Sequence, residues 1–184
     1  MASTLYVCAV PIGNVDDITK RVESCLMNVR AIAAEDTRVA KQLIASLGIK
    51  SSKYYIRMDQ YQEKSSFDTF DSVINQEDIA FVTDAGSPGI SDPGAMLVQH
   101  CYDHNIQVMC LPGVSAVSTF ISGMGILMDS FYFSGFFPRK LGARKQLLDF
   151  LVHNQLVGIW FESPKRILDL VEWLALQYPM MEIV

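Results

Sequence analysis

A loop rich in glycine and proline follows the apolar run Ile79–Val82 and has the residue types suited to contact a ligand through its backbone. It reads DAGSPGISDPG over residues 84–94. Gly86 and Gly89 let the main chain approach a ligand closely, while Pro88 fixes φ and reduces the entropy lost on ordering. Asp92 is expected to cap the following helix, but a cap needs only one or two residues. The remaining residues of the loop therefore favour a ligand-binding role.

Two other loops repeat this design at Pro11–Asn14 and Pro112–Ala116, each directly after an apolar run. The first has Gly13 as its only glycine, so both the dinucleotide pattern G-x-G-x-x-G and the phosphate-binding P-loop are absent. The second lacks the final glycine of a nucleophile elbow, which excludes a serine hydrolase of that type. The sequence thus indicates a ligand site that uses none of these three motifs.

Five apolar runs alternate with helical patterns and predict the strands of one sheet. They are Leu5–Val10, Ala31–Ala34, Tyr54–Arg57, Ile79–Val82 and Val108–Leu111. Because crossover connections between such strands are right-handed, the alternation predicts one parallel sheet with helices on both faces. Ligands of open α/β sheets bind beyond the carboxyl ends of the strands, which is where the three loops fall.

The sequence changes character near Gly123, and we predict an N-terminal α/β domain over residues 1–122 and a partial C-terminal α/β domain over 123–184. Phe131–Phe137 is aromatic with a central glycine, and Val157–Phe161 is a further expected strand. Ser163 and Pro164 are expected to start a helix, as N-cap and first residue. The last residues, 182–184, resemble the beginning of another strand.

The composition predicts a globular protein, since half of the residues are hydrophobic. The net charge of −5 argues against charge-driven, nonspecific nucleic-acid binding, so any such contact must use local basic patches. Cys8, Cys25, Cys101 and Cys110 lack paired spacing, and we expect reduced core thiols in a cytoplasmic protein without a signal sequence, membrane span or metal.

Six motifs, in order, carry a resemblance to a known family. They are Val10–Asn14 with Asp17–Thr19, Ala33–Arg38, Asp84–Pro88 with Ile90–Gly94, Pro112–Gly113 with Ser115–Ala116, Gly135–Phe136 with Pro138–Lys140, and Phe161–Pro164 with Arg166. On these motifs the chain resembles the tetrapyrrole (corrin/porphyrin) methylase superfamily of S-adenosylmethionine-dependent enzymes. Within it, the chain is most similar to the branch that 2′-O-methylates a cytidine ribose in small-subunit rRNA.

The resemblance implies two α/β domains with S-adenosylmethionine in the cleft between them, a homodimer, and small-subunit rRNA or the small ribosomal subunit as partner. Two departures stand out. Met58–Glu63 replaces a polar cluster that is usual in the family. Members of the family also continue past the position of Val184, so the second domain is expected to be truncated.

A ribose hydroxyl attacks well only when its proton is accepted, so a general base is expected near it. The carboxylates that follow strands are the candidates, namely Glu35, Asp36 and Glu162, with Arg38 beside them. For Asp36, a helix N-cap is an equal alternative. For Glu35 and Glu162, a salt bridge with Arg38 or Arg166 is at least as good an explanation.

The resemblance also assigns binding residues. The expected cofactor contacts are Pro11, Gly13, Asp84, Ala85, Gly86, Ser87, Pro88, Ile90, Ser115, Ala116 and Phe161. Core packing is the stronger explanation for Phe161. The expected RNA contacts are Arg139, Lys140, Arg144, Lys145 and Arg166, with Lys165 nearby, although a charge run is also typical of a solvated helix face.

Three functions are compatible with the residues. The first is a methyltransferase acting on rRNA ribose, and the second is a methylase of a small tetrapyrrole with the same fold. The third is a non-catalytic cofactor-binding or assembly module, suggested by the short C-terminus and the altered Met58–Glu63 segment.

Overall fold

The computed structural model describes residues 3–58, 64–90, 92 and 94–184. The chain divides into two units, Met1–Thr119 (unit 1) and Phe120–Val184 (unit 2). Helix α5 (Ala116–Gly123) contains the boundary between them.

Unit 1 is built on a five-stranded sheet in the order β3-β2-β4-β1-β5. The strands are β1 (Thr4–Cys8), β2 (Ala31–Ala34), β3 (Tyr54–Arg57), β4 (Ile79–Val82) and β5 (Gln107–Leu111). All neighbouring strands are parallel, which confirms the predicted α/β fold class.

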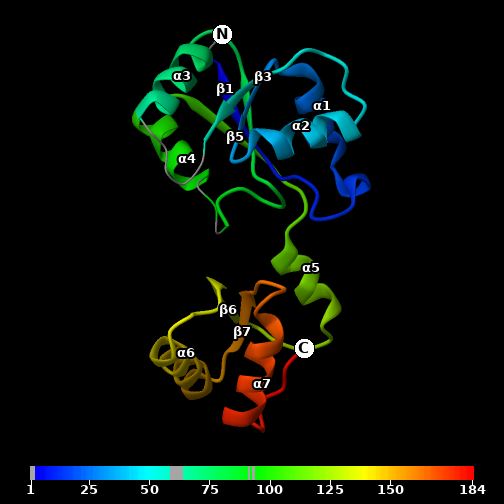
Figure 1. The fold of residues 1–184 in the computed structure, drawn as a ribbon. Coiled ribbons are helices and arrows are strands. Elements are labelled where there is room, and N and C mark those ends of the chain that lie inside the picture. Colours follow the sequence, from blue (N-terminus) through cyan, green and yellow to red (C-terminus); the bar gives the residue numbers. More distant parts are fainter. Residues whose placement is uncertain (1–2, 59–63, 91, 93) are drawn as a thin grey trace. The chain divides into compact units, whose positions relative to one another are not determined.

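Helices cover both faces of this sheet. Helices α1 (Lys20–Asn28) and α2 (Thr37–Ser46) lie on one face, and α3 (Lys64–Ile74) and α4 (Gly94–Asp103) lie on the other (Figure 1). Every residue of β2 and β4 is buried, as expected of parallel strands covered on both sides. The edge strands β3 and β5 each have several exposed residues and only one buried residue, which explains why the β3 sequence is the least apolar of the five.

The first strand is shorter than predicted, because β1 ends at Cys8 and Val10 instead pairs in an antiparallel bridge with Gly86. A short 3₁₀ helix, η1 (Val15–Asp17), follows, and Ile18 terminates it rather than belonging to the next helix. Thr19 caps α1 by accepting a hydrogen bond from the Val22 N–H. This cap sets the start of α1 at Lys20.

Unit 2 has a two-stranded parallel sheet of β6 (Phe131–Phe136) and β7 (Val157–Phe161), with helices α6 (Leu141–Asn154) and α7 (Ile167–Gln177). Phe137, Leu148, Leu151, Leu170 and Leu174 form its core. Two expectations were wrong. Residues 163–166 form a turn closed by the Arg166 N–H bonding to the Ser163 carbonyl, so α7 begins at Ile167. Residues 181–184 form neither helix nor strand.

All four cysteines are free thiols, but only Cys8 and Cys101 are buried. Cys25 is half-buried and Cys110 is exposed, so the expectation of four core thiols was wrong for these two. In the part of the chain that the structure describes, no helix is long and apolar enough to cross a bilayer.

Candidate functional site at the carboxyl edge of the sheet

The loops that follow β1, β4 and β5 are joined to one another at the carboxyl edge of the sheet. The Val10 N–H bonds to the Gly86 carbonyl at 2.9 Å, and the Gly86 N–H bonds to the Val10 carbonyl at 3.0 Å. The Ser87 hydroxyl donates to the Val114 carbonyl at 2.9 Å. Gly113 lies against Ala9, which closes the series into a ring. No one of these loops can therefore move without straining the other two.

Two glycines permit this close approach. Gly86 has φ of +78°, a left-handed conformation that L side chains rarely adopt, and a Cβ there would meet Ile12 at 3.4 Å. At Gly113, a Cβ would lie only 2.9 Å from the Cβ of Ala9. The spacing of the β1 and β5 loops thus depends on the absence of a side chain at Gly113.

The backbone is open at Gly13, a predicted cofactor contact, and at Gly89 of the β4 loop. A Cβ built on Gly13 or Gly89 meets no atom within 4 Å, so a ligand can approach both residues. The Asp92 carboxylate accepts hydrogen bonds from the Gly89 N–H at 2.7 Å and the Gly94 N–H at 2.8 Å. The second bond confirms that Asp92 caps α4, and the first fixes the end of the loop.

The other predicted contacts of unit 1 occupy the same loops. Pro11, Ser87, Pro88 and Ser115 are half-buried, and Ala85, Ile90 and Ala116 are exposed. The Ser115 carbonyl accepts the Thr119 N–H in the first turn of α5. These loops thus offer a mixed surface of backbone groups and short side chains.

Asp36, at the end of β2, is held by Arg38. Its carboxylate caps α2 by accepting the Arg38 N–H at 2.8 Å, and the Arg38 guanidinium forms a fork with both carboxylate oxygens. This contact keeps the pKa of Asp36 well below its ordinary value of 3.8 and raises the pKa of Arg38. The N-cap alternative for Asp36 is confirmed, and a carboxylate held in this way is a weak base.

Asp84 follows β4, and its pKa is shifted in the opposite direction to that of Asp36. Partial burial, and secondarily the negative charge of Asp36, raise its pKa, while the backbone of Asp36 and the charge of Arg38 oppose the rise. The adjacent strands β2 and β4 thus bring together one carboxylate held as an anion and one with increased proton affinity. Unequal carboxylates of this kind are typical of functional sites.

Sequence reasoning missed Arg57 as a member of this group. It is the last residue of β3, and its charge also lowers the pKa of Asp36. The rule that pointed to Asp36 and Asp84, a polar residue at a strand end, applies equally to Arg57. Glu35 is half-buried beside Asp36 and makes interactions of its own.

Glu162 follows β7 in unit 2, and its side chain is only 5% exposed. Oε1 accepts the Ser163 N–H at 2.6 Å, and Oε2 lies 3.0 Å from the Arg166 guanidinium without hydrogen-bond geometry. The salt-bridge alternative for Glu162 is thereby confirmed. Phe161 is half-buried and packs edge-on against Phe133 and the exposed Phe136, outside the core cluster of unit 2, so the core-packing explanation is not confirmed.

The predicted RNA-contacting residues divide into two groups. Arg144 donates to the Pro138 carbonyl at 2.9 Å and lies over the rings of Phe137 and Trp173. Arg166 contacts Glu162 and the Phe137 carbonyl, so both arginines stabilise unit 2. The remaining cations, Arg139, Lys140, Lys145 and Lys165, are exposed.

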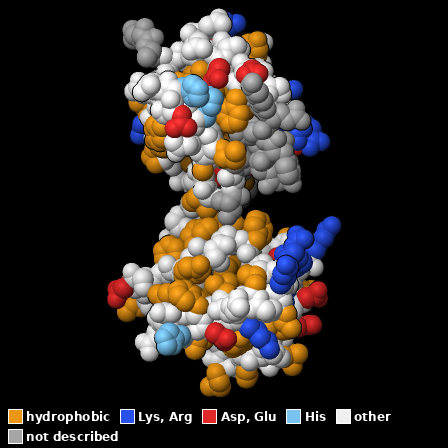
Figure 2. Space-filling model, turned by 90° about the vertical axis from the view of Figure 1, so that its left-hand side faces the viewer, with side chains coloured by type: hydrophobic (Ala, Val, Ile, Leu, Met, Phe, Trp, Pro, Cys, Tyr) orange, Lys and Arg blue, Asp and Glu red, His pale blue; other side chains and the backbone are white. Residues whose placement is uncertain are grey.

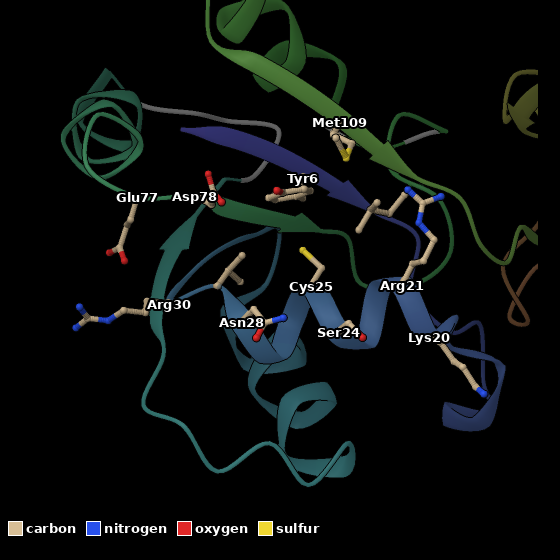
Figure 3. A pocket seen from close by; sticks show the side chains of 12 residues that line it. Tyr6, Lys20, Arg21, Ser24, Cys25, Asn28, Arg30, Glu77, Asp78 and Met109 are labelled. Carbon is tan, nitrogen blue, oxygen red and sulfur yellow. The ribbon is translucent and has the colours of Figure 1, made fainter. Parts of the chain in front are cut away.

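A cavity of about 710 Å³ in unit 1 contains none of the predicted site residues. It runs along α1 beside Tyr6 and Met109, with Lys20 and Arg21 at one end and Arg30 and Glu77 at the other (Figure 3). In the described ranges, no group of three or more acidic, histidine or cysteine side chains could hold a metal ion. Apart from the buried Met58, the Met58–Glu63 segment lies outside the described residues.

The solved structures whose fold is similar to that of this chain include two methyltransferases. The methyltransferase CobJ has a TM-score of 0.59 and 14% identity, covering 89% of this chain and 70% of CobJ. Uroporphyrin-III-C-methyltransferase from Thermus thermophilus has a TM-score of 0.57 and 15% identity, covering 81% and 72%. At such low identity, these likenesses show the fold alone.

The curated proteins that are similar to this chain include two examples of ribosomal RNA small subunit methyltransferase I. The protein from Haemophilus influenzae is 40% identical over 172 residues, which is 94% of this chain and 60% of that protein. The protein from Vibrio cholerae is 40% identical over 168 residues, or 91% and 58%. This chain thus spans about 60% of the length of these relatives.

The family model described as Tetrapyrrole (Corrin/Porphyrin) Methylases matches residues 4–184. The chain belongs to this family, and the resemblance inferred from its motifs is confirmed.

Proposed function

We propose that this chain is part of an S-adenosylmethionine-dependent methyltransferase that modifies the 2′-hydroxyl of a cytidine ribose in small-subunit rRNA. The observation that carries the proposal is the 40% identity, over more than nine-tenths of the chain, to ribosomal RNA small subunit methyltransferases. The relatives are longer than this chain, so the proposal rests on the region that they share.

The carboxyl edge of unit 1 fits S-adenosylmethionine. Gly13 and Gly89 leave their backbone open to a ligand, and the exposed Asp84 carboxylate suits a cationic sulfonium. We propose that the loops containing Pro11, Asp84–Pro88 and Ser115 hold it. When bound, S-adenosylmethionine supplies an already activated methyl group, so the main task of these residues is to orient it.

The general base is a separate question. Asp36 is held as an anion by Arg38, so it accepts a proton less readily than an unpaired carboxylate, and Glu162 is paired with Arg166. We propose Glu35 as the first candidate to test, because it directly follows β2 at the carboxyl edge, and Asp84, whose pKa is raised, as a further candidate near Asp36. Asp36 and Arg38 act as the rigid support of this edge.

For the RNA substrate, we propose that Arg139, Lys140 and Lys145 contact phosphates, because their charges are exposed. Arg144 and Arg166 are excluded from a first test, since their contacts stabilise unit 2. Replacing Lys140 and Lys145 by Glu is expected to weaken binding of small ribosomal subunits and reduce its salt dependence. The substitutions Lys41→Glu and Lys50→Glu, at exposed positions of unit 1, change the net charge by the same amount and are the matched control.

A tetrapyrrole methylase is the alternative with some support, since uroporphyrin-III-C-methyltransferase shares the fold. That similarity comes with only 15% identity, whereas the rRNA methyltransferases share 40%, which favours RNA.

The decisive experiment offers labelled S-adenosylmethionine with either small ribosomal subunits or uroporphyrinogen III, using this chain and a version extended to the length of its relatives. We expect label in the ribosomal RNA, loss of the label with Glu35→Gln, and normal labelling with Asp68→Asn, an exposed residue of α3. Label in the tetrapyrrole alone would establish the alternative. Calorimetry that detects no S-adenosylmethionine binding to either version would exclude a methyltransferase and leave a non-catalytic module.

We also propose that the chain forms a homodimer through unit 2. Phe131, Tyr132 and Phe136 of β6 are exposed, and hydrophobic side chains gather on the surface of unit 2 (Figure 2). A two-fold contact is the commonest way to bury such a surface. Light scattering at micromolar concentration should give the mass of two chains, and a monodisperse monomer would refute the dimer.

A further inference from the structure

Two thiols meet between the sheet and α1 of unit 1. Cys8, the last residue of β1, is fully buried in the core cluster on the α1 face, and Cys25 of α1 packs against the same cluster. The two side chains lie close enough to shift each other's pKa, and the Cys8 thiol donates to the Tyr6 carbonyl at 3.5 Å. The cysteines are separated in sequence by the whole β1 loop and η1, so this contact is created by the fold.

Cys25 is reached through a cavity, whereas Cys8 is buried. Cys25 lines the cavity of about 710 Å³ beside α1, and Figure 3 shows its sulfur directed from the helix toward the strands. Lys20 and Arg21, in the first turn of α1, line the same cavity. Cys8 is not among the lining residues. A small reagent entering the cavity therefore meets Cys25 first, with Cys8 behind it.

The two sulfurs differ in proton affinity. The interaction with Cys8 lowers the pKa of Cys25, and the charge of Lys53 adds to this effect, while burial and Asp78 oppose it. The interaction with Cys25, and secondarily burial, raise the pKa of Cys8. Lys53 is fixed near the end of α1 by donating to the carbonyls of Met27 and Val29. Cys25 is thus the nucleophile of the pair, and Cys8 keeps its proton.

We propose that Cys25 is a site of oxidative modification, at which a peroxide entering the cavity leads to a disulfide between Cys25 and Cys8. In the first step, the Cys25 sulfur attacks one peroxide oxygen and the O–O bond breaks, giving a sulfenic acid and water. In the second, the Cys8 sulfur attacks the Cys25 sulfur and its proton passes to the sulfenic oxygen, so the S–O bond breaks and a second water leaves. Two thiols lose two electrons in total, and one peroxide is reduced.

The other two cysteines provide internal controls. Cys101 is buried on the opposite face of the sheet, and burial raises its pKa to about 12. Cys110 is exposed, but its register partner on β1 is Val7, whose side chain belongs to the α3 and α4 face. Because residues paired in register share a face, Cys110 points away from Cys8 and Cys25. Exposure alone therefore predicts that Cys110 reacts first, whereas the proposal predicts Cys25.

The experiment uses the reduced chain and an equimolar amount of hydrogen peroxide, followed by blocking of free thiols and trypsin digestion. Cleavage after Lys20, Arg21 and Arg30 places Cys8 in peptide 1–20 and Cys25 in peptide 22–30. The two peptides are expected to appear linked by a disulfide and to separate on reduction. In the reduced chain, iodoacetamide should label Cys25 several-fold faster than Cys101 and faster than Cys110.

Variants separate the proposal from nonspecific oxidation. Cys25→Ser should abolish the linked peptides, whereas Cys110→Ser should leave their yield unchanged; circular dichroism of each variant verifies its folding. Oxidation that gives mainly Cys110-linked dimers, or alkylation of Cys25 no faster than that of Cys101, would overturn the proposal. The measurement on the unmodified sequence decides the question even if Cys25→Ser does not fold.

Discussion

Replacing Gly113 by Ala tests whether the loops of the carboxyl edge are held at the spacing that the structure shows. The added Cβ would lie 2.9 Å from the Ala9 Cβ and 3.3 Å from the Ala9 carbonyl oxygen, whereas ordinary contacts begin at 3.4 Å. Neither Ala9 group can rotate away, because one is a methyl fixed to the backbone and the other is the backbone itself. The β1 and β5 loops must therefore separate by about half an ångström.

Overpacking of this kind costs about 1–3 kcal/mol of unfolding free energy. For a unit of this size, each kcal/mol corresponds to about 3–6 °C in Tm. The strain also acts on neighbouring contacts, since the Ala9 N–H already bonds to the Leu111 carbonyl at a long 3.3 Å. We expect a lower urea midpoint with an unchanged m-value, and weaker binding of S-adenosylmethionine.

The matched control is Gly142→Ala in the first turn of α6, where a Cβ meets nothing within 4 Å. There the same substitution is expected to stabilise the chain by up to about 1 kcal/mol through helix propensity. Urea denaturation followed by circular dichroism compares the two variants. Gly113→Ala with wild-type stability, or an equal loss in Gly142→Ala, would show that the contact with Ala9 does not hold the loops. The stability result stands independently of cofactor binding.

Two other substitutions test the charged pairs. Arg38→Ala should raise the pKa of Asp36 toward 3.8, as measured by NMR titration, because the guanidinium is the main cause of its depression. A carboxyl group whose pKa is depressed on folding contributes stability above pH 3.8, and this stability is lost as the pH falls through the folded-state pKa. Acid unfolding of the Arg38→Ala variant should therefore lack this contribution. An unchanged pKa of Asp36 in the variant would contradict the fork between Arg38 and Asp36. Arg166→Ala should cost about 1–3 kcal/mol, between the values for exposed and fully buried pairs, because it leaves the 5%-exposed Glu162 without its cation. Adding Glu162→Gln should recover part of that loss in thermal denaturation, and a full loss in the double variant would point to packing rather than charge.

Most of unit 1 could be predicted because its strands are covered on both faces. Ala31–Ala34 and Ile79–Val82 are buried throughout, so an apolar run gave their limits directly. The ends of elements were harder, since they depend on contacts that have no local pattern. Val10 continues the apolar run of β1 in sequence but pairs with Gly86 of a distant loop. Ser163 followed by Pro164 has the pattern of a helix start, yet α7 begins only at Ile167.

For the candidate site, likewise, the position of a residue in the sequence could be used, but its contacts could not be predicted. Position after a strand was enough to select Asp36 and Asp84, because the carboxyl ends of parallel strands share one edge. It could not distinguish them, since the difference arises from Arg38, which holds Asp36, and from the partial burial of Asp84. Among basic residues, likewise, sequence gave no reason to separate Arg144, which packs on Phe137 and Trp173, from the exposed Lys145 beside it.

The ring of contacts among three loops explains why the motifs of this chain are scattered yet act as one site. Val10 joins the β1 loop to the β4 loop, Ser87 joins the β4 loop to the β5 loop, and Gly113 brings the β5 loop back to Ala9. Each loop is rigid only because the other two are in place, so the entropy of ordering is lost on folding rather than on binding. A ligand at this edge then meets a preorganised backbone surface, and that surface needs glycine at the close contacts and proline between them. The composition that first drew attention to residues 84–94 follows from this requirement.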